Sequence, residues 1–212
     1  MNVQLKEKKG ESRILPNKER SRELIALDIR MEMTALVTGK RPWPWYLWGN
    51  PGVGKTCCVL CMLDFASGMY YTADQWASDL NEARLGKLNE VVPGPVRIVG
   101  ADDGWRYGEL HPELIKPGRE VRGVDKTMVV TPADLWRRMK LAELFVLDDV
   151  GMRDAASEHQ RLSVKRVLDD RCGLPVVVIG NRPPGELKAV YGEATARRLI
   201  EGTVTMYPSR RS

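Results

Sequence analysis

The sequence lacks any long apolar run, which limits where the protein can reside. No stretch of the 212 residues approaches the roughly eighteen consecutive apolar residues that a membrane-spanning helix needs. The N-terminus carries Lys6, Lys8 and Lys9 with no apolar stretch after them, so it is not a secretory signal. We therefore expect a protein of the cytoplasm with no membrane-embedded part.

Residues that bind transition metals are also scarce. The chain has 2 histidines, which lie far apart in the sequence, and 4 cysteines. Cys58 and Cys61 form a C-x-x-C pair, but a structural zinc site would need a second pair of ligands near it. Free cysteine packs well as a small apolar residue, so we interpret these cysteines as reduced members of a buried helix.

The composition favours a soluble globular protein with at most one large domain. Hydrophobic residues make up 43% and charged residues 29% of the chain. The net charge of +5 permits a nucleic-acid partner but does not identify one. Residues 1–42 form a polar, basic arm followed by a predicted helix, and we place the main domain at residues 43–212.

Apolar segments alternate between strand-like and helix-like patterns through the main domain. Strands are predicted at residues 45–48, 69–72, 96–99, 144–147, 175–179 and 203–207. Helices are predicted at residues 17–39, 57–66, 74–85, 157–172 and 186–199, with a further one starting at Thr131. This alternation predicts an α/β fold with three layers, in which helices cover both faces of a mostly parallel sheet.

The segment Gly49-Asn-Pro-Gly-Val-Gly-Lys-Thr56 matches the phosphate-binding loop G-x-x-x-x-G-K-[ST] at every fixed position. Glycines allow the backbone N–H groups to curl around a phosphate, and the helix that follows adds its positive N-terminal end. Lys55 places a charge on the β- and γ-phosphates, and the Thr56 hydroxyl binds Mg²⁺. The predicted nucleotide-binding residues are Gly49, Asn50, Pro51, Gly52, Val53, Gly54, Lys55, Thr56 and Cys57.

Two acidic residues follow the apolar run Leu144–Leu147. Ligands of open α/β sheets bind at the carboxyl ends of the strands, so both acids are expected near the phosphates. By position, Asp148 is the acid on the metal side, and Asp149 is placed to orient or deprotonate the attacking water. A solvated acidic loop is the alternative interpretation.

A polar amide, Asn181, follows the next apolar run and could position the same water. Its alternative is an ordinary loop residue before Arg182 and two prolines. The chain has no Asn-Lys-x-Asp string, as a GTPase would require for guanine, and no arginine-rich lid of a small-molecule kinase. These absences favour an ATPase.

The order of these motifs resembles one known family. The strings GNPGVGKT, YYTADQWASDL, LFVLDDVG, VVVIGNRPPGEL and ATARRLIEG look like the AAA+ ATPases of the DnaC and IstB type, which are helicase loaders and transposition helper ATPases of bacteria and phages. The likeness covers residues 43–85 and 129–212. It implies a three-layer P-loop fold with a short or absent C-terminal lid.

The resemblance also implies roles for individual residues. Asp148 matches the second acid of the metal site and Asn181 the first sensor of the nucleotide state. Arg198 matches the arginine that such proteins insert into the neighbouring subunit's site, which we count with Asp149 and Asn181 as catalytic. Either Arg210 or Arg211 matches the second sensor, which contacts the nucleotide of its own subunit.

By the same resemblance, the chain is expected to bind ATP or ADP with Mg²⁺, to hydrolyse ATP and to associate with itself when ATP is bound. The expected partners are a replicative helicase or a transposase, together with single-stranded or double-stranded DNA, in replication or transposition. Two other hypotheses stay open: a P-loop phosphotransferase acting on a small molecule, and a nucleotide-gated adaptor with little hydrolysis.

Three features depart from the family pattern. Asp149 stands where glutamate is common, so turnover is expected to be slow. Residues 86–128 are longer than the usual connection and are predicted to be an insertion, whose Trp105 and Tyr107 are candidates for partner recognition. About 42 residues precede the first strand, so we do not expect among them the domain with which helicase loaders grip the helicase.

Overall fold

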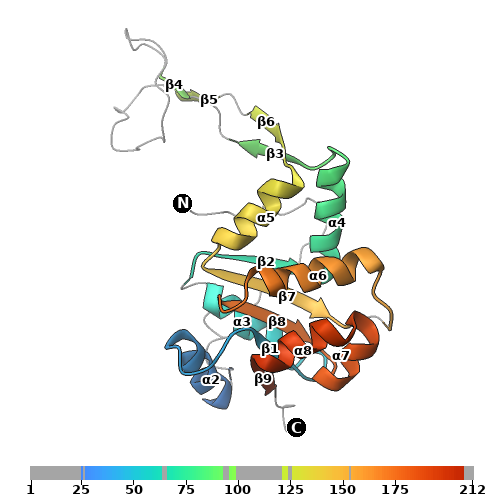
Figure 1. Ribbon diagram of the computed structural model, residues 1–212. Helices are drawn as coiled ribbons and strands as arrows, with labels where there is room; N and C mark the ends of the chain where they lie inside the picture. Colours follow the sequence, from blue (N-terminus) through green and yellow to red (C-terminus); the bar gives the residue numbers. More distant parts are fainter. Residues whose placement is uncertain are drawn as a thin grey trace. The chain divides into compact units, whose positions relative to one another are not determined.

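The computed structural model describes residues 25, 27–63, 66–92, 96–98, 121–123, 126–152 and 154–207. The chain divides into two compact units (Figure 1). The first comprises residues 1–78 and 136–212, and the second comprises residues 79–135. The helices α4 (Ala73–Arg84) and α5 (Pro132–Leu141) contribute residues to both units.

The first unit is built on a five-stranded sheet in the order β2-β7-β8-β1-β9. Every neighbouring pair in this sheet is parallel. The strands are β1 (Trp45–Trp48), β2 (Gly68–Thr72), β7 (Leu144–Val150), β8 (Val176–Gly180) and β9 (Thr203–Met206). All of their carboxyl ends therefore meet at one edge of the sheet, and the predicted parallel α/β architecture is confirmed.

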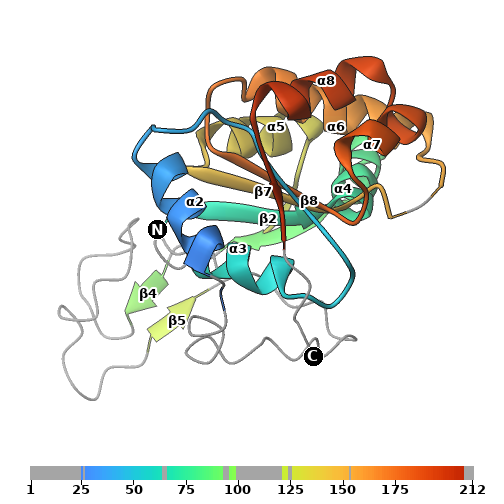
Figure 2. The same ribbon diagram turned by 90° about the horizontal axis from the view of Figure 1, so that it is seen from below.

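Helices cover both faces of this sheet, with α2 and α3 on one side and α6, α7 and α8 on the other (Figure 2). Their bounds are α2 (Leu27–Val37), α3 (Lys55–Leu63), α6 (Glu158–Asp170), α7 (Pro184–Tyr191) and α8 (Glu193–Glu201). The three layers agree with the predicted fold class. The central strands β7 and β8 are buried along their apolar runs because both faces are covered.

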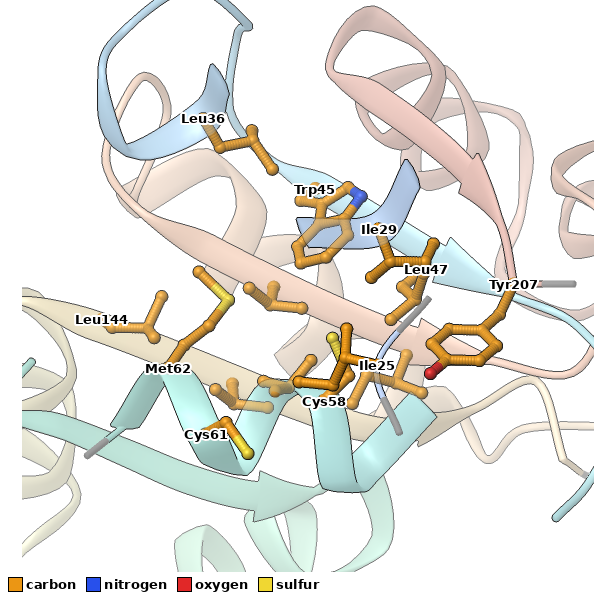
Figure 3. Close-up of a cluster of buried hydrophobic side chains, with 14 of the residues drawn as sticks. Ile25, Ile29, Leu36, Trp45, Leu47, Cys58, Cys61, Met62, Leu144 and Tyr207 are labelled. Atoms are coloured by element: carbon orange, nitrogen blue, oxygen red, sulfur yellow. The ribbon is translucent and has the colours of Figure 1, made fainter. Parts of the chain in front are cut away.

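One hydrophobic core lies between the sheet and the pair α2 and α3 (Figure 3). Trp45 and Leu47 of β1 point into it, together with Cys58 and Cys61 of α3. The Cys58 side chain is fully buried, and this burial raises the pKa of its thiol to about 12. The apolar interpretation of the Cys58–Cys61 pair therefore agrees with its surroundings.

An aromatic cluster packs on the opposite face of the sheet. Phe145 of β7 stacks on Tyr71 of β2, with ring centroids 6.1 Å apart. Trp76 of α4 contacts both rings edge-on, at 5.0 Å from Tyr71 and 5.4 Å from Phe145. Because side chains alternate along a strand, the neighbours Tyr70 and Tyr71 must face opposite sides of the sheet.

The second unit contains two pairs of antiparallel strands. The strand β3 (Asn89–Val92) pairs with β6 (Lys126–Val129), and β4 (Val96–Ile98) pairs with β5 (Val121–Gly123). The insertion predicted at residues 86–128 falls within this unit. Of these four strands, the sequence pattern predicted only the one near residue 96. Trp105 and Tyr107 lie outside the described residues.

Two helix predictions need comment. The segment predicted as one helix at residues 186–199 forms two helices, α7 and α8, because Gly192 has a φ of 86° and interrupts the helical backbone. The helix predicted at residues 17–39 is described from Leu27 onward as α2, and its predicted start lies outside the described residues. Among the helices that the structure describes, none is long and apolar enough to cross a bilayer.

A buried arginine joins the ends of two helices to the sheet. Arg171, at the C-terminal cap of α6, is 2% exposed. Its guanidinium donates to the carbonyl oxygens of Met139 and Ala142 and to that of Pro175, just before β8. This one side chain therefore fixes where α5 and α6 end relative to the start of β8.

Replacing Arg171 with alanine should lower the free energy of unfolding by about 2–4 kcal/mol, because three buried carbonyl groups lose their donor. Urea denaturation followed by circular dichroism measures this change. The matched control is Arg161→Ala on the exposed side of α6, which should change stability by less than about 0.5 kcal/mol. Equal effects of the two variants would contradict the assigned role of Arg171.

Candidate functional site

The phosphate-binding loop connects β1 to α3 at the carboxyl edge of the sheet. Three of its glycines have positive φ angles, 151° at Gly49, 76° at Gly52 and 111° at Gly54. At Gly49 a side chain is excluded for a second reason, because a Cβ atom would lie 2.8 Å from the carbonyl oxygen of Tyr207. The loop therefore has the curled backbone that brings successive N–H groups to one side.

Lys55 is the first residue of α3 and is 6% exposed. Its ammonium group donates to the carbonyl oxygens of Gly49 and Asn50 and to Oδ1 of Asn181, each at 2.8 Å. Burial lowers the pKa of Lys55, and the nearby charges of Asp148 and Asp149 oppose this shift. The structure thus brings together two motifs that lie 126 residues apart in the sequence.

The next residue, Thr56, contacts the first of the two predicted acids. Its hydroxyl donates to Oδ2 of Asp148 at 2.7 Å. Asp148 is 3% exposed, and its other oxygen accepts the N–H group of Asp149 at 2.7 Å. A hydroxyl and a carboxylate at this separation are oxygen ligands of the kind that Mg²⁺ prefers.

This pair is a suitable site for a magnesium ion that also binds phosphates. The described residues contain no group of three or more His, Cys, Asp or Glu side chains that could hold a metal ion by themselves. Mg²⁺ usually takes one or two protein ligands and completes its shell with phosphate oxygens and water. Thr56 and Asp148 fit that requirement.

Asp149 occupies an irregular position at the end of β7. The register between β7 and β8 shifts between Leu147 and Val150, which indicates a β-bulge. Asp149 has a φ of 59°, the one positive value among the described residues other than glycine. Its side chain is exposed and lines an open hollow together with Asp74, Gln160 and Tyr191.

Asn181 follows β8, the strand that lies between β1 and β7. It is therefore placed between the phosphate-binding loop and the acids of β7, and its Oδ1 accepts from Lys55. Its amide nitrogen contacts the sulfur atom of Met152. The predicted sensor position thus reaches the lysine of the loop directly.

Arg198 is the one predicted arginine that lies within the described residues. Arg198 lies on α8, where it donates to Asp169 at 3.2 Å and to Glu201 at 3.4 Å within its own chain. Its side chain is 38% exposed, and its role toward a neighbouring subunit stays a prediction. Arg210 and Arg211 lie outside the described residues.

The remaining loop residue of the prediction, Cys57, is half-buried on the first turn of α3. Its backbone position after Thr56 is compatible with the predicted contact to a phosphate.

Sequence reasoning missed two features of this site. Tyr70 was not among the predicted site residues, yet its hydroxyl donates to Oδ2 of Asp148 at 2.6 Å. Asp74 and Gln160 line the hollow beside Asp149, and the Nε2 of Gln160 donates to Oδ1 of Asp74 at 2.8 Å. No spacing rule links these residues to the acids of β7, although the parallel pairing of β2 with β7 could have suggested that Tyr70 lies near them.

Replacing Lys55 with methionine should leave the stability of the nucleotide-free chain unchanged or raise it. The lowered pKa means that folding disfavours the charged lysine, and methionine removes that cost while filling similar volume. The unfolded chain binds more protons than the folded one between the folded pKa and 10.5, so the wild type gains stability as pH rises through this range. The difference between variant and wild type should therefore shrink with rising pH.

Urea denaturation at pH 7 and at pH 10 measures this difference. A loss of more than about 2 kcal/mol at pH 7 would show that the three hydrogen bonds of Lys55 outweigh its desolvation.

Comparison with known proteins was made at the level of sequence and of structure. No protein-family model matches the chain, and no curated protein sequence matches it. Solved structures do match, at 14–15% identity. At this identity the matches show the fold alone.

Three of these structures illustrate the match. A DNA replication initiation factor aligns with a TM-score of 0.57 at 15% identity, over 85% of this chain and 45% of its own length. Domain III of the Thermotoga maritima replication initiation protein DnaA aligns with a TM-score of 0.54 at 14% identity, over 85% and 61%. The DnaC helicase loader aligns with a TM-score of 0.51 at 14% identity, over 77% of each chain.

The chain thus spans less than two thirds of the two initiator structures. The chain shares the three-layer α/β fold of these replication initiators and of the helicase loader. The fold that the sequence resemblance implies is therefore confirmed.

Proposed function

We propose that the chain binds ATP with Mg²⁺ at the phosphate-binding loop and hydrolyses it. The observation that carries this proposal is the convergence of Lys55, Thr56, Asp148 and Asn181 through direct hydrogen bonds at the carboxyl edge of the sheet. Side chains from three separate strand ends meet at the place where open α/β sheets bind their ligands. One of the matching structures, DnaA from Aquifex aeolicus, contains the ATP analogue AMPPCP.

The loop would hold the triphosphate through its backbone N–H groups and the N-terminal end of α3. Lys55 would exchange its carbonyl and amide partners for phosphate oxygens, which carry full negative charge and form stronger hydrogen bonds with an ammonium group. Thr56 and Asp148 would hold the magnesium ion. When bound, that ion would offset the negative charge of the phosphates.

Asp149 and Asn181 would position the attacking water. Asp149 is exposed at a bulge, the kind of irregularity that turns a side chain toward an active site. A carboxylate there can accept a proton from water as the water oxygen bonds to the γ-phosphorus, while the bond from that phosphorus to the β-phosphate oxygen breaks and ADP leaves. Asn181 reaches Lys55 and would couple the position of the water to that of the phosphate.

Asp149→Asn should separate binding from hydrolysis, because the amide keeps the shape and tolerates the backbone of Asp149 but accepts a proton poorly. ATP affinity measured by calorimetry should change less than threefold or so, while phosphate release falls about 10²–10⁴-fold. Lys55→Ala is the variant for comparison, because it should abolish the binding of ATP. Hydrolysis by Asp149→Asn at the wild-type rate would contradict the assigned role of Asp149.

We further propose that the site is completed by a second copy of the chain. The resemblance places Arg198 as the residue that reaches a neighbour's γ-phosphate, and an arginine there would offset charge in the transition state. Arg198 of α8 pairs with Asp169 of α6 and with Glu201 of its own helix, and all three side chains are partly exposed. Exposed ion pairs of this kind are worth little, so Arg198 could exchange these partners for a phosphate.

Mixing two inactive variants tests the shared site. Arg198→Ala keeps its own acids but lacks the arginine, and Asp149→Asn lacks the acid but supplies the arginine. The mixture should recover hydrolysis that neither variant shows alone, and wild-type turnover should rise with protein concentration. Arg197→Ala is the control, because it is the adjacent exposed arginine with a partner on its own helix. Turnover that is independent of concentration, with no recovery on mixing, would contradict a shared site.

The cellular role that we propose is a nucleotide-controlled step in DNA replication or transposition, such as loading or regulating a replicative helicase or a transposase. The support is the shared fold with a helicase loader and with a replication initiator solved in complex with single-stranded DNA. An added single-stranded oligonucleotide in the mixing experiment should raise turnover and the amount of ATP-dependent oligomer. An oligonucleotide without effect on either quantity would argue against a DNA partner.

A further inference from the structure

Two hydroxyl groups converge on one oxygen of the acid at the end of β7. Oδ2 of Asp148 accepts the hydroxyl of Thr56 at 2.7 Å and the hydroxyl of Tyr70 at 2.6 Å. The second oxygen accepts the N–H group of Asp149 at 2.7 Å. This carboxylate is therefore held by donors from α3, from β2 and from its own strand.

The sheet register explains how Tyr70 reaches Asp148. Tyr70 is paired with Val146 in the parallel ladder, and Thr72 is paired with Asp148. Residues two apart on a strand face the same side, so Asp148 follows Val146 on the face that packs against α3. A tyrosine ring leaning along β2 toward the strand end then brings its hydroxyl to the carboxylate.

A buried carboxylate needs such donors. Asp148 is 3% exposed, and a charged group that is removed from water is costly unless hydrogen bonds replace its hydration. Hydrogen bonds to an ionised acceptor are about twice as strong as neutral ones and are strongly directional. Each donor consequently restricts the rotation of the Asp148 side chain.

The two hydroxyl groups have unequal tasks in the proposed function. Thr56 belongs to the nucleotide-binding loop and is itself an expected ligand of Mg²⁺. Tyr70 belongs to β2, a strand that supplies none of the loop or acid residues. It can hold Asp148 in place whether or not the nucleotide is bound.

We propose that Tyr70 is a positioning residue for the magnesium site, whose hydroxyl holds the Asp148 carboxylate facing Thr56 and thereby sets the affinity for Mg²⁺ together with ATP. This inference rests on the proposed ATP-binding function and adds a residue to it. A tyrosine that served only packing would behave differently, because its hydroxyl could be removed without any effect on the metal.

The experiment compares ATP affinity with Mg²⁺ and with EDTA in the wild type and in Tyr70→Phe. Affinity without metal depends on the loop and Lys55, so it should stay within about twofold. The gain in affinity produced by Mg²⁺ should fall about tenfold, the loss expected for one hydrogen bond to a charged group. Titration of the metal-free chain and ATP with Mn²⁺, followed by electron paramagnetic resonance, gives the same comparison without turnover.

Tyr71→Phe is the matched control. It makes the same chemical change one residue along β2, on the opposite face of the sheet, where the ring stacks on Phe145. In this variant Mg²⁺ should raise the ATP affinity by the same factor as in the wild type. In an Asp148→Asn background, Tyr70→Phe should change the gain by less than about twofold, because the charged acceptor is already absent.

The outcomes distinguish this inference from the function on which it rests. If the wild type binds MgATP and Mg²⁺ raises the ATP affinity of Tyr70→Phe by the same factor, the role of Tyr70 is overturned. The proposed function then still stands. An equal loss with and without metal would overturn the role of Tyr70 as well, since that result marks a packing role. A wild type that binds no nucleotide would overturn both.

Discussion

The hydrogen bond from Thr56 to Asp148 is the interaction on which the rest of the site depends. It joins the first turn of α3, the helix that follows β1, to β7, although β8 lies between β1 and β7 in the sheet. With this bond in place, the loop, the acids and Asn181, which follows β8, lie together at one edge of the sheet. Because both faces of the sheet are covered, β7 and β8 cannot shift without disrupting the hydrophobic core on one face and the packing on the other. This packing makes the geometry of the site rigid.

The bulge at Asp149 gives a physical reason for aspartate at a position where the resembled family often has glutamate. A residue with a φ of 59° is in the left-handed region, which asparagine and aspartate tolerate better than residues with longer side chains. The backbone at this point also advances the side chain out of the regular pleat, so a shorter acid is displayed to solvent. The bulge and the aspartate are therefore consistent with each other. Glutamate would adopt this backbone conformation at a higher cost than aspartate.

Sequence reasoning predicted those parts of the molecule that follow from local patterns. The strands that carry Lys55, Asp148 and Asn181 to one edge were predictable because buried parallel strands read as unbroken apolar runs. The bulge, the contact of Tyr70 with Asp148 and most strands of the second unit were not. A bulge depends on pairing between β7 and β8, and the Tyr70 contact depends on the register of β2 against β7. Such long-range pairings leave no periodic signal within either segment. The roles of the site residues stay predictions.

The state of Lys55 links the stability of the chain to its proposed function. Its ammonium group is buried and donates to two carbonyl oxygens and an amide oxygen, which are neutral acceptors. The lowered pKa shows that these acceptors do not fully replace water. A phosphate oxygen carries the charge that they lack, so binding would relieve a cost already present in the folded chain. Part of the affinity for a nucleotide would then come from offsetting the desolvation of Lys55 rather than from new contacts alone.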